Sequence, residues 1–218
     1  MELAGDQPWP RHRLRAHLSR ALAGAAVDLD AVADAAELLV RCFGRGGKVL
    51  IFGNGGSAAC AQHLAGEFVC RMTRIRPPLP AIALTADTAL LTAIANDFGF
   101  ERVFSRQVEA LGRPEDVALA ISTSGRSPNV LAAVTAARRL GMATVGLAGA
   151  APSPLHQLAD VTVAAAADGT GRVQEIHLAV QHALCGSVEA ALFESLPDDA
   201  ADQVPDRVAD VAGQGAGA

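Results

Sequence analysis

Hydrophobic residues along this chain fall into short continuous runs separated by longer segments with helical spacing. The short runs cover residues 49–52, 81–84, 117–122, 144–147 and 161–163, and each of them predicts a strand. The longest helical segment extends from about residue 172 to residue 193. Strands that alternate with helices over such a length predict an α/β fold. We expect a doubly wound parallel five-stranded sheet flanked by helices.

The segment before the first strand predicts a pair of helices. Residues 11–43 carry two apolar stripes with helical spacing, and a turn is expected near residues 26–28, where Asp28 or Asp30 could cap the second helix. The two ends of the chain have little to bury. We therefore expect a disordered N-terminus over 1–10, a single domain over 11–195 that includes the helical pair, and a flexible C-terminal tail over 196–218.

Composition narrows the class of protein. The 218 residues are half hydrophobic, which is enough for a sizeable core, and we expect no apolar run long enough to span a membrane and no secretory signal. The four cysteines are scattered without a CxxC pair, so a disulfide framework is not indicated. A net charge of −5 gives no electrostatic reason to bind nucleic acid. The expectation is a cytoplasmic protein with neither nucleic-acid nor membrane partners.

Candidate chemistry begins where the first strand ends. A GNGG turn over 53–56 leads into a helix for which Ser57 is a candidate N-cap. Glycines let the backbone approach a ligand, and the free N–H groups of a first helical turn favour an anion. The same helix carries His63 and Glu67 on one face, four residues apart. A glycine turn alone can serve only to reverse the chain, but together these features indicate chemistry on a small phosphorylated molecule.

A second turn repeats this arrangement with more hydroxyl groups. The strand over 117–122 ends in Ser122, Thr123 and Ser124, and Ser127 precedes the helix that begins at Pro128. Hydroxyl groups and a helix N-terminus at the carboxyl end of a strand form a phosphate cradle that needs no cationic side chain. The alternative is a serine-rich capped turn, which the density of hydroxyl groups makes the weaker interpretation.

The last helix carries several polar side chains among apolar ones. Gln174 and His182 are eight residues apart and lie on roughly the same side, whereas His177 and Gln181 form a pair on another side. Glu175 points in a third direction. Spacing alone does not choose among these faces, and a solvent-facing helix edge would also explain them.

Four stretches together resemble the sugar isomerase (SIS) domain family, specifically its phosphoheptose isomerases. They are FGNGGSAACAQHLAGEF at 52–68, TADTALLTAIANDFGFERVFSRQVEALGRPEDV at 85–117, ISTSGRSPNV at 121–130 and RVQEIHLAVQH at 172–182. The resemblance covers roughly residues 14–193. It implies a SIS fold in a homotetramer whose active sites lie between subunits. It also implies interconversion of sedoheptulose 7-phosphate and D-glycero-D-manno-heptose 7-phosphate through an enediol, for heptose nucleotide biosynthesis.

The resemblance also assigns roles to residues. It implies Glu67 and His182 as the catalytic acid/base pair, and one Zn²⁺ per subunit held by His63, Glu67, Gln174 and His182. The substrate-binding residues it implies are Asn54, Gly55, Ser57, Asn96, Asp97, Ser122, Thr123, Ser124, Ser127 and Gln174. A carboxylate suits removal of a carbon-bound proton, and Zn²⁺ suits polarisation of a carbonyl. Whether Glu67 is ligand, base or both in turn is a hypothesis.

Two non-catalytic alternatives come from the same family. One resembling relative associates with a replication initiator and has no isomerase activity, but it lacks the glutamate and the final histidine that stand here as Glu67 and His182. The other is a sugar-phosphate-sensing domain, which is usually attached to a DNA-binding module. The N-terminal helices here lack a basic recognition face. The sequence therefore favours the enzyme.

Overall fold

The computed structural model describes residues 26–150 and 152–193. The expected disordered N-terminus, the first of the two N-terminal helices and the C-terminal tail lie outside the described residues, so those predictions remain open. The second N-terminal helix, α2 (Leu29–Gly44), is present, and Asp28 caps it by accepting hydrogen bonds from the backbone N–H groups of Asp30 and Ala31.

The sheet confirms the predicted class. Five parallel strands lie in the order β3-β2-β4-β5-β6, and they are β2 (Val49–Gly53), β3 (Ala81–Ala83), β4 (Val117–Ser122), β5 (Ala143–Gly149) and β6 (Val161–Ala166). Every residue of β2 and β4 is buried, which explains their continuous apolar runs, because a central parallel strand is covered on both faces.

One short strand replaces a predicted turn. Ala26 and Val27 form β1 (Ala26–Val27), which pairs antiparallel with β6 at the edge of the sheet. The expected turn near residues 26–28 is therefore wrong for these two residues. The physical reason is that the edge of β6 offers unpaired backbone groups, which an adjacent extended segment can satisfy.

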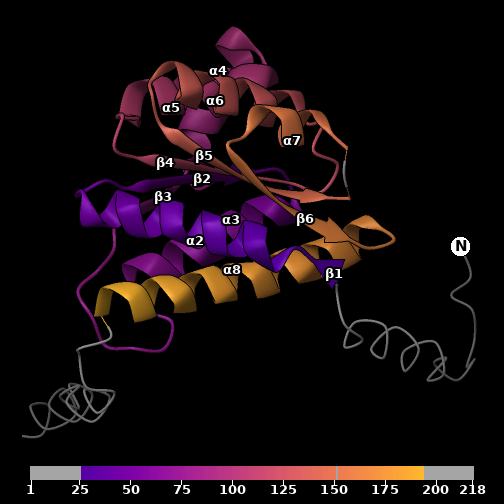
Figure 1. The fold of residues 1–218 in the computed structure, drawn as a ribbon. Helices are drawn as coiled ribbons and strands as arrows, with labels where there is room; N and C mark the ends of the chain where they lie inside the picture. Colours follow the sequence, from indigo (N-terminus) through magenta and orange to yellow (C-terminus); the bar gives the residue numbers. More distant parts are fainter. Residues whose placement is uncertain (1–25, 151, 194–218) are drawn as a thin grey trace, which may run out of the picture.

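Helices cover both faces of the sheet (Figure 1). On one face, α2 packs with α3 (Gly56–Val69) and α8 (Thr170–Phe193) around a core that includes Ile51, Leu119 and Leu184. The other face carries α4 (Thr88–Phe98), the 3₁₀ helix η1 (Phe100–Arg102), α5 (Ser105–Leu111), α6 (Pro128–Arg139) and α7 (Pro154–Leu158). The sequence pattern did not predict the short helix α7 or the 3₁₀ helix η1 on this face.

The helix α8 corrects one expectation from the sequence. Among the described residues it is the one helix that is long and apolar enough to cross a membrane, with 44 % of its most apolar 18-residue window buried inside the protein. Its side chains Val180, Leu184 and Val188 belong to the core shared with α2 and α3. We conclude that α8 is a core helix, whose apolar face serves packing.

Candidate active site

A cavity of about 320 Å³ opens at the carboxyl ends of β2 and β4, between the first turns of α3 and α8. It lies where the strand order reverses, because the chain continues from β2 outward to β3 and returns to β4. Its lining comprises Asn54, Gly55, Gly56, Ser57, Ile121, Ser122, Thr123, Ser127, Thr170 and Gln174. Seven of the ten substrate-binding residues predicted from the sequence therefore meet in one cavity, and its lining includes no charged side chain.

The glycine turn before α3 leaves the N-terminus of this helix open to the cavity. Gly55 occupies the N-cap position with φ +55°, a conformation that favours glycine, and no side chain caps the helix. Ser57 is therefore not the N-cap that its position suggested. It is a buried residue of the first helical turn, and its backbone N–H bonds the Asn54 carbonyl. With no capping side chain in the way, the start of α3 faces the cavity directly.

The second turn presents hydroxyl groups beside the start of α6. The Oγ atoms of Ser122 and Ser127 lie 3.2 Å apart, and Ser127 is the N-cap of α6 without making a side-chain cap. Ser124 is exposed and lines an adjoining hollow of about 250 Å³ that shares Thr123 and Thr170 with the main cavity. The hydroxyl cluster predicted from the sequence thus surrounds two connected parts of one site.

Two residues of the site were not predicted from the sequence. Asn129 is buried and exchanges two side-chain hydrogen bonds with Asn54, and Thr170 lines both hollows at the first residue of α8. Asn129 follows Pro128 in the stretch at 121–130 that carries the family resemblance, so its position in the sequence could have indicated a role in the site. Nothing in the spacing, however, indicated that its amide would reach across to the neighbouring strand.

A second cluster lies further along the same two helices. The Nε2 atoms of His63 on α3 and His182 on α8 are 2.9 Å apart, and Glu67 Oε1 is 3.7 Å from His63 Nε2. The rings meet edge to face, with centroids 5.2 Å apart. At hydrogen-bond distance one nitrogen must donate to the other. The arrangement therefore brings two proton-carrying rings and a carboxylate together between α3 and α8.

His177 lies on the side of α8 that faces the sheet, away from the cavity. It is fully buried, and its Nε2 lies 3.0 Å from the carbonyl oxygen of Ala148 at the end of β5. Burial lowers the pKa of His177, which keeps the ring neutral beneath α8. His177 thus packs α8 on the sheet, whereas Gln174 lines the cavity and His182 contacts α3.

Asn96 and Asp97 are not in the cavity of a single chain. Both are exposed on α4, which covers the other face of the sheet (Figure 1). The Asn96 amide donates to Asp97 over 2.8 Å. Asp97 lines a separate hollow together with Phe98 and Arg106. One copy of the chain therefore does not bring these two predicted residues to the others.

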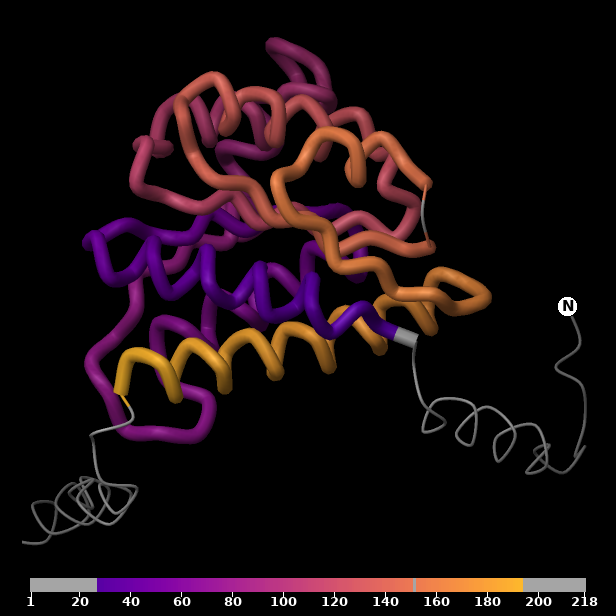
Figure 2. The backbone as a smooth tube through the Cα atoms, in the orientation of Figure 1, coloured from indigo at the N-terminus to yellow at the C-terminus, as the bar shows by residue number. Residues whose placement is uncertain are grey.

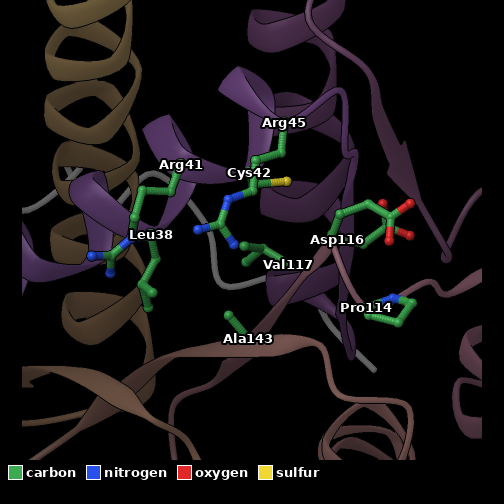
Figure 3. Close-up of a pocket in the computed structure, with 9 residues that line it drawn as sticks. Leu38, Arg41, Cys42, Arg45, Pro114, Asp116, Val117 and Ala143 are labelled. Carbon is green, nitrogen blue, oxygen red and sulfur yellow. The ribbon is translucent and has the colours of Figure 1, made fainter.

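A smaller cavity of about 80 Å³ lies at the opposite ends of the strands (Figure 3). Arg41, Cys42 and Arg45 from the end of α2 face Asp116 and Val117 at the start of β4. Burial raises the pKa of the Cys42 thiol to about 11, so this group is inert at neutral pH. The volume is too small for a sugar phosphate, and the predicted site residues all lie elsewhere.

An α/β sheet with a hydroxyl-lined cavity at its switch point defines the class of protein, and residues 14–149 match the SIS domain family. The phosphoheptose isomerase of Roseiflexus sp. (strain RS-1) is 57% identical over 159 residues, which cover 73% of this chain and 81% of that protein. The enzyme of that name from Bradyrhizobium sp. (strain BTAi1 / ATCC BAA-1182) is 48% identical over 199 residues, or 90% of this chain and 100% of that protein. The solved structure of phosphoheptose isomerase GmhA from Neisseria gonorrhoeae superposes with a TM-score of 0.74 at 39% identity, covering 83% of this chain and 98% of that chain. The chain belongs to the SIS domain family and, within it, to the phosphoheptose isomerases.

Proposed function

We propose that this protein is an aldose–ketose isomerase, an intramolecular oxidoreductase that converts sedoheptulose 7-phosphate to D-glycero-D-manno-heptose 7-phosphate for heptose nucleotide biosynthesis. One observation carries the proposal. The hydroxyl-lined cavity and the His63–Glu67–His182 cluster lie between the same two helices, α3 and α8. An extended sugar phosphate can therefore place its phosphate in the cavity and its reacting carbons beside the cluster.

The cavity suits the phosphate and the sugar hydroxyl groups. The hydroxyl groups of Ser122, Thr123, Ser124 and Ser127, with the start of α6, would hold the phosphate without a cationic side chain. The first turn, through Asn54, Gly55 and Ser57, and the Gln174 amide would contact the sugar. Binding at the phosphate end fixes the position of the carbons at the other end.

The cluster suits proton transfer between neighbouring carbons. Glu67 would remove the proton from C1 of the ketose and return it to C2, while the carbonyl moves from C2 to C1 through an enediol. His182 would move the accompanying protons between the two oxygens. Glu67 is partly buried beside His63, so its carboxylate is shielded from bulk water while it stays open to a ligand.

We assign to the same cluster one Zn²⁺ per subunit, held by His63, Glu67, Gln174 and His182. Within residues 26–150 and 152–193 no three His, Cys, Asp or Glu side chains stand in a complete metal-binding geometry. The chemistry of the donors nevertheless fits, because imidazole and carboxylate groups are common zinc ligands, and the Nε2 atoms of His63 and His182 lie 2.9 Å apart with Glu67 Oε1 3.7 Å from His63 Nε2. Bound zinc would polarise the substrate carbonyl and stabilise negative charge on its oxygen.

We further propose that the protein acts in the cytoplasm as a homotetramer with its active sites between subunits. Asn96 and Asp97 belong to the predicted site yet lie outside the cavity of one chain, so another subunit would have to supply them. Large apolar side chains are also exposed near them, namely Leu90, Phe98 and Phe100. Such a concentration of exposed apolar surface favours an interface.

A coupled isomerase assay on sedoheptulose 7-phosphate tests the proposal. Turnover is expected from the wild type, with loss on chelation and recovery with added Zn²⁺. Glu67→Gln and His182→Ala are each expected to abolish turnover and to retain phosphate binding. Glu109→Gln is the matched control, since this glutamate on α5 forms a surface ion pair with Arg102 of η1 and should leave turnover unchanged.

The assay also separates the non-catalytic alternatives. A folded wild type that gives no turnover with or without Zn²⁺ would refute the isomerase and favour a sugar-phosphate-sensing or replication-initiator-associating tetramer. Full activity in Glu67→Gln would show that another residue acts as the base.

A further inference from the structure

A buried ion pair joins the segment after α3 to the last third of α8. Arg76 Nε lies 3.0 Å from Glu189 Oε1, and their side chains are 0% and 1% exposed. Figure 2 shows the segment 70–80 running beside the end of α8. A buried pair of charges requires further hydrogen bonds to offset its desolvation, so the remaining donors and acceptors of the two groups must also be satisfied.

The rest of the Arg76 guanidinium binds the end of α3. Its Nη2 donates to the carbonyl of Glu67 over 2.8 Å, and its Nη1 donates to the carbonyl of Phe68 over 2.8 Å. Nη1 also reaches the Pro77 carbonyl. The last carbonyls of a helix have no partner within it, and a cation there is favourable. Arg76 therefore fixes the helical turn that carries Glu67.

The Glu189 carboxylate holds Arg76 and its segment in place. Besides Arg76 it accepts hydrogen bonds from the backbone N–H groups of Met72, Thr73 and Arg74, and from the Thr73 hydroxyl. Burial by itself would raise the pKa of Glu189, but these hydrogen bonds outweigh it and lower the pKa to about 2. The carboxylate is therefore charged at every pH at which the protein would work.

The pair connects the two helices that carry the proton-transfer cluster. Glu189 lies seven residues after His182 on α8, which is about 10 Å along the helix axis, and Arg76 binds the backbone of Glu67 itself. We propose that Arg76 and Glu189 are positioning residues that hold the Glu67 carboxylate in register with His63 and His182. This inference rests on the proposed isomerase function.

Arginine is required because of its shape as well as its charge. The planar guanidinium directs separate N–H groups at Glu67, Phe68 and Glu189 at once. A lysine ammonium in the same place keeps the charge but has no planar fork to span these acceptors. Arg76→Lys should therefore loosen the end of α3 while leaving the cavity at its start unchanged.

The test compares Arg76→Lys with Asp116→Asn. Asp116 is also buried, pairs with Lys48 over 2.6 Å and accepts the backbone N–H groups of Lys48 and Arg113, but it lies at the amino ends of the strands. Both variants should lose stability by denaturant unfolding. Only Arg76→Lys should lower kcat for sedoheptulose 7-phosphate, by about 10- to 100-fold as expected for a misplaced catalytic group, with KM within about twofold of the wild type.

The outcomes separate positioning from plain stability. Wild-type kcat in Arg76→Lys, or an equal loss of kcat in Asp116→Asn, would overturn the inference. If Arg76→Lys does not fold, Glu189→Gln is judged by the same criterion, because it keeps the size of the side chain and removes its charge. A wild type without turnover refutes the proposed function first, and this inference with it.

Discussion

Asn54 and Asn129 exchange two side-chain hydrogen bonds, of 2.9 and 2.8 Å, across the carboxyl ends of β2 and β4. Each amide donates to the other, and the Asn129 oxygen also accepts the backbone N–H of Val130. The pair thus ties the glycine turn before α3 to the first turn of α6. We infer that it sets the distance between the two turns that line the cavity.

Replacing Asn129 with leucine should weaken both folding and substrate binding. Loss of the amide leaves the partly buried Asn54 side chain without its partner, and a lost hydrogen bond of this kind costs about 0.5–1.5 kcal/mol. The free energy of unfolding is measured by urea titration and KM by the isomerase assay, and KM should rise. Thr135→Val on the same helix is the control, since it removes only a bond from the Thr135 hydroxyl to the Leu131 carbonyl and should change stability by less than about 0.5 kcal/mol. Equal effects of the two variants would contradict this account.

Gly125 in the hydroxyl-rich turn should not tolerate a side chain. Its φ is +61°, and a Cβ there would overlap the Ser153 side chain, so Gly125→Ala must move the turn that presents Ser124 and Ser127. We expect KM for the sugar phosphate to rise about tenfold or more, equivalent to about 1.4 kcal/mol of binding. Gly46→Ala is the matched control, because Gly46 has φ +76° but open space around it. Gly46→Ala should lower the free energy of unfolding by about 1 kcal/mol, the cost of a side chain at positive φ, with no change in KM.

Features that depend on a single segment, such as the buried strands and the hydroxyl-rich turn, were predictable from the sequence. The buried runs that became β2 and β4 and the hydroxyl groups from Ser122 to Ser127 follow from composition along one segment, and the structure places them as expected. The amide pair of Asn54 and Asn129 depends instead on the register between two strands, in which Gly53 lies opposite Ile121. That register cannot be inferred from the sequence of either segment alone.

Helix faces were predictable only in part. The i, i+4 spacing correctly placed His63 and Glu67 together, but the choice of Gln174 and His182 over His177 and Gln181 needed the family resemblance. The packing of α8 against α3 and the sheet decides which side of α8 is buried. The spacing of residues along α8 does not contain that information.

Acid should destabilise the protein through Glu189 in a measurable window. Its pKa is about 2 in the folded protein and near 4.5 when unfolded, so its contribution is complete above pH 4.5 and is lost as the pH falls toward 2. The full contribution is roughly 3 kcal/mol, of which about 2 kcal/mol is lost by pH 3. Between pH 6 and pH 3, unfolding free energies from urea titration should fall by about 2 kcal/mol more in the wild type than in Glu189→Gln.

The control for this pH dependence is Glu109→Gln, which removes an exposed carboxylate from a surface ion pair. Its unfolding free energy should follow the wild-type curve in parallel, because exposed pairs contribute little. Parallel curves for the wild type and Glu189→Gln would show that the buried carboxylate is not the acid-sensitive group.

Gln181 should be replaceable by leucine with a gain in stability. It is fully buried on α8, and neither polar atom of its amide has a hydrogen-bond partner among the described residues, so its desolvation is not offset. Gln181→Leu should raise the free energy of unfolding by about 1–2 kcal/mol. Gln107→Leu is the matched comparison, because this buried amide donates to the carbonyls of Leu84 and Val103 and its loss should lower stability by about 1–3 kcal/mol. Destabilisation of similar size in both variants would mean that Gln181 has a partner in the assembled protein.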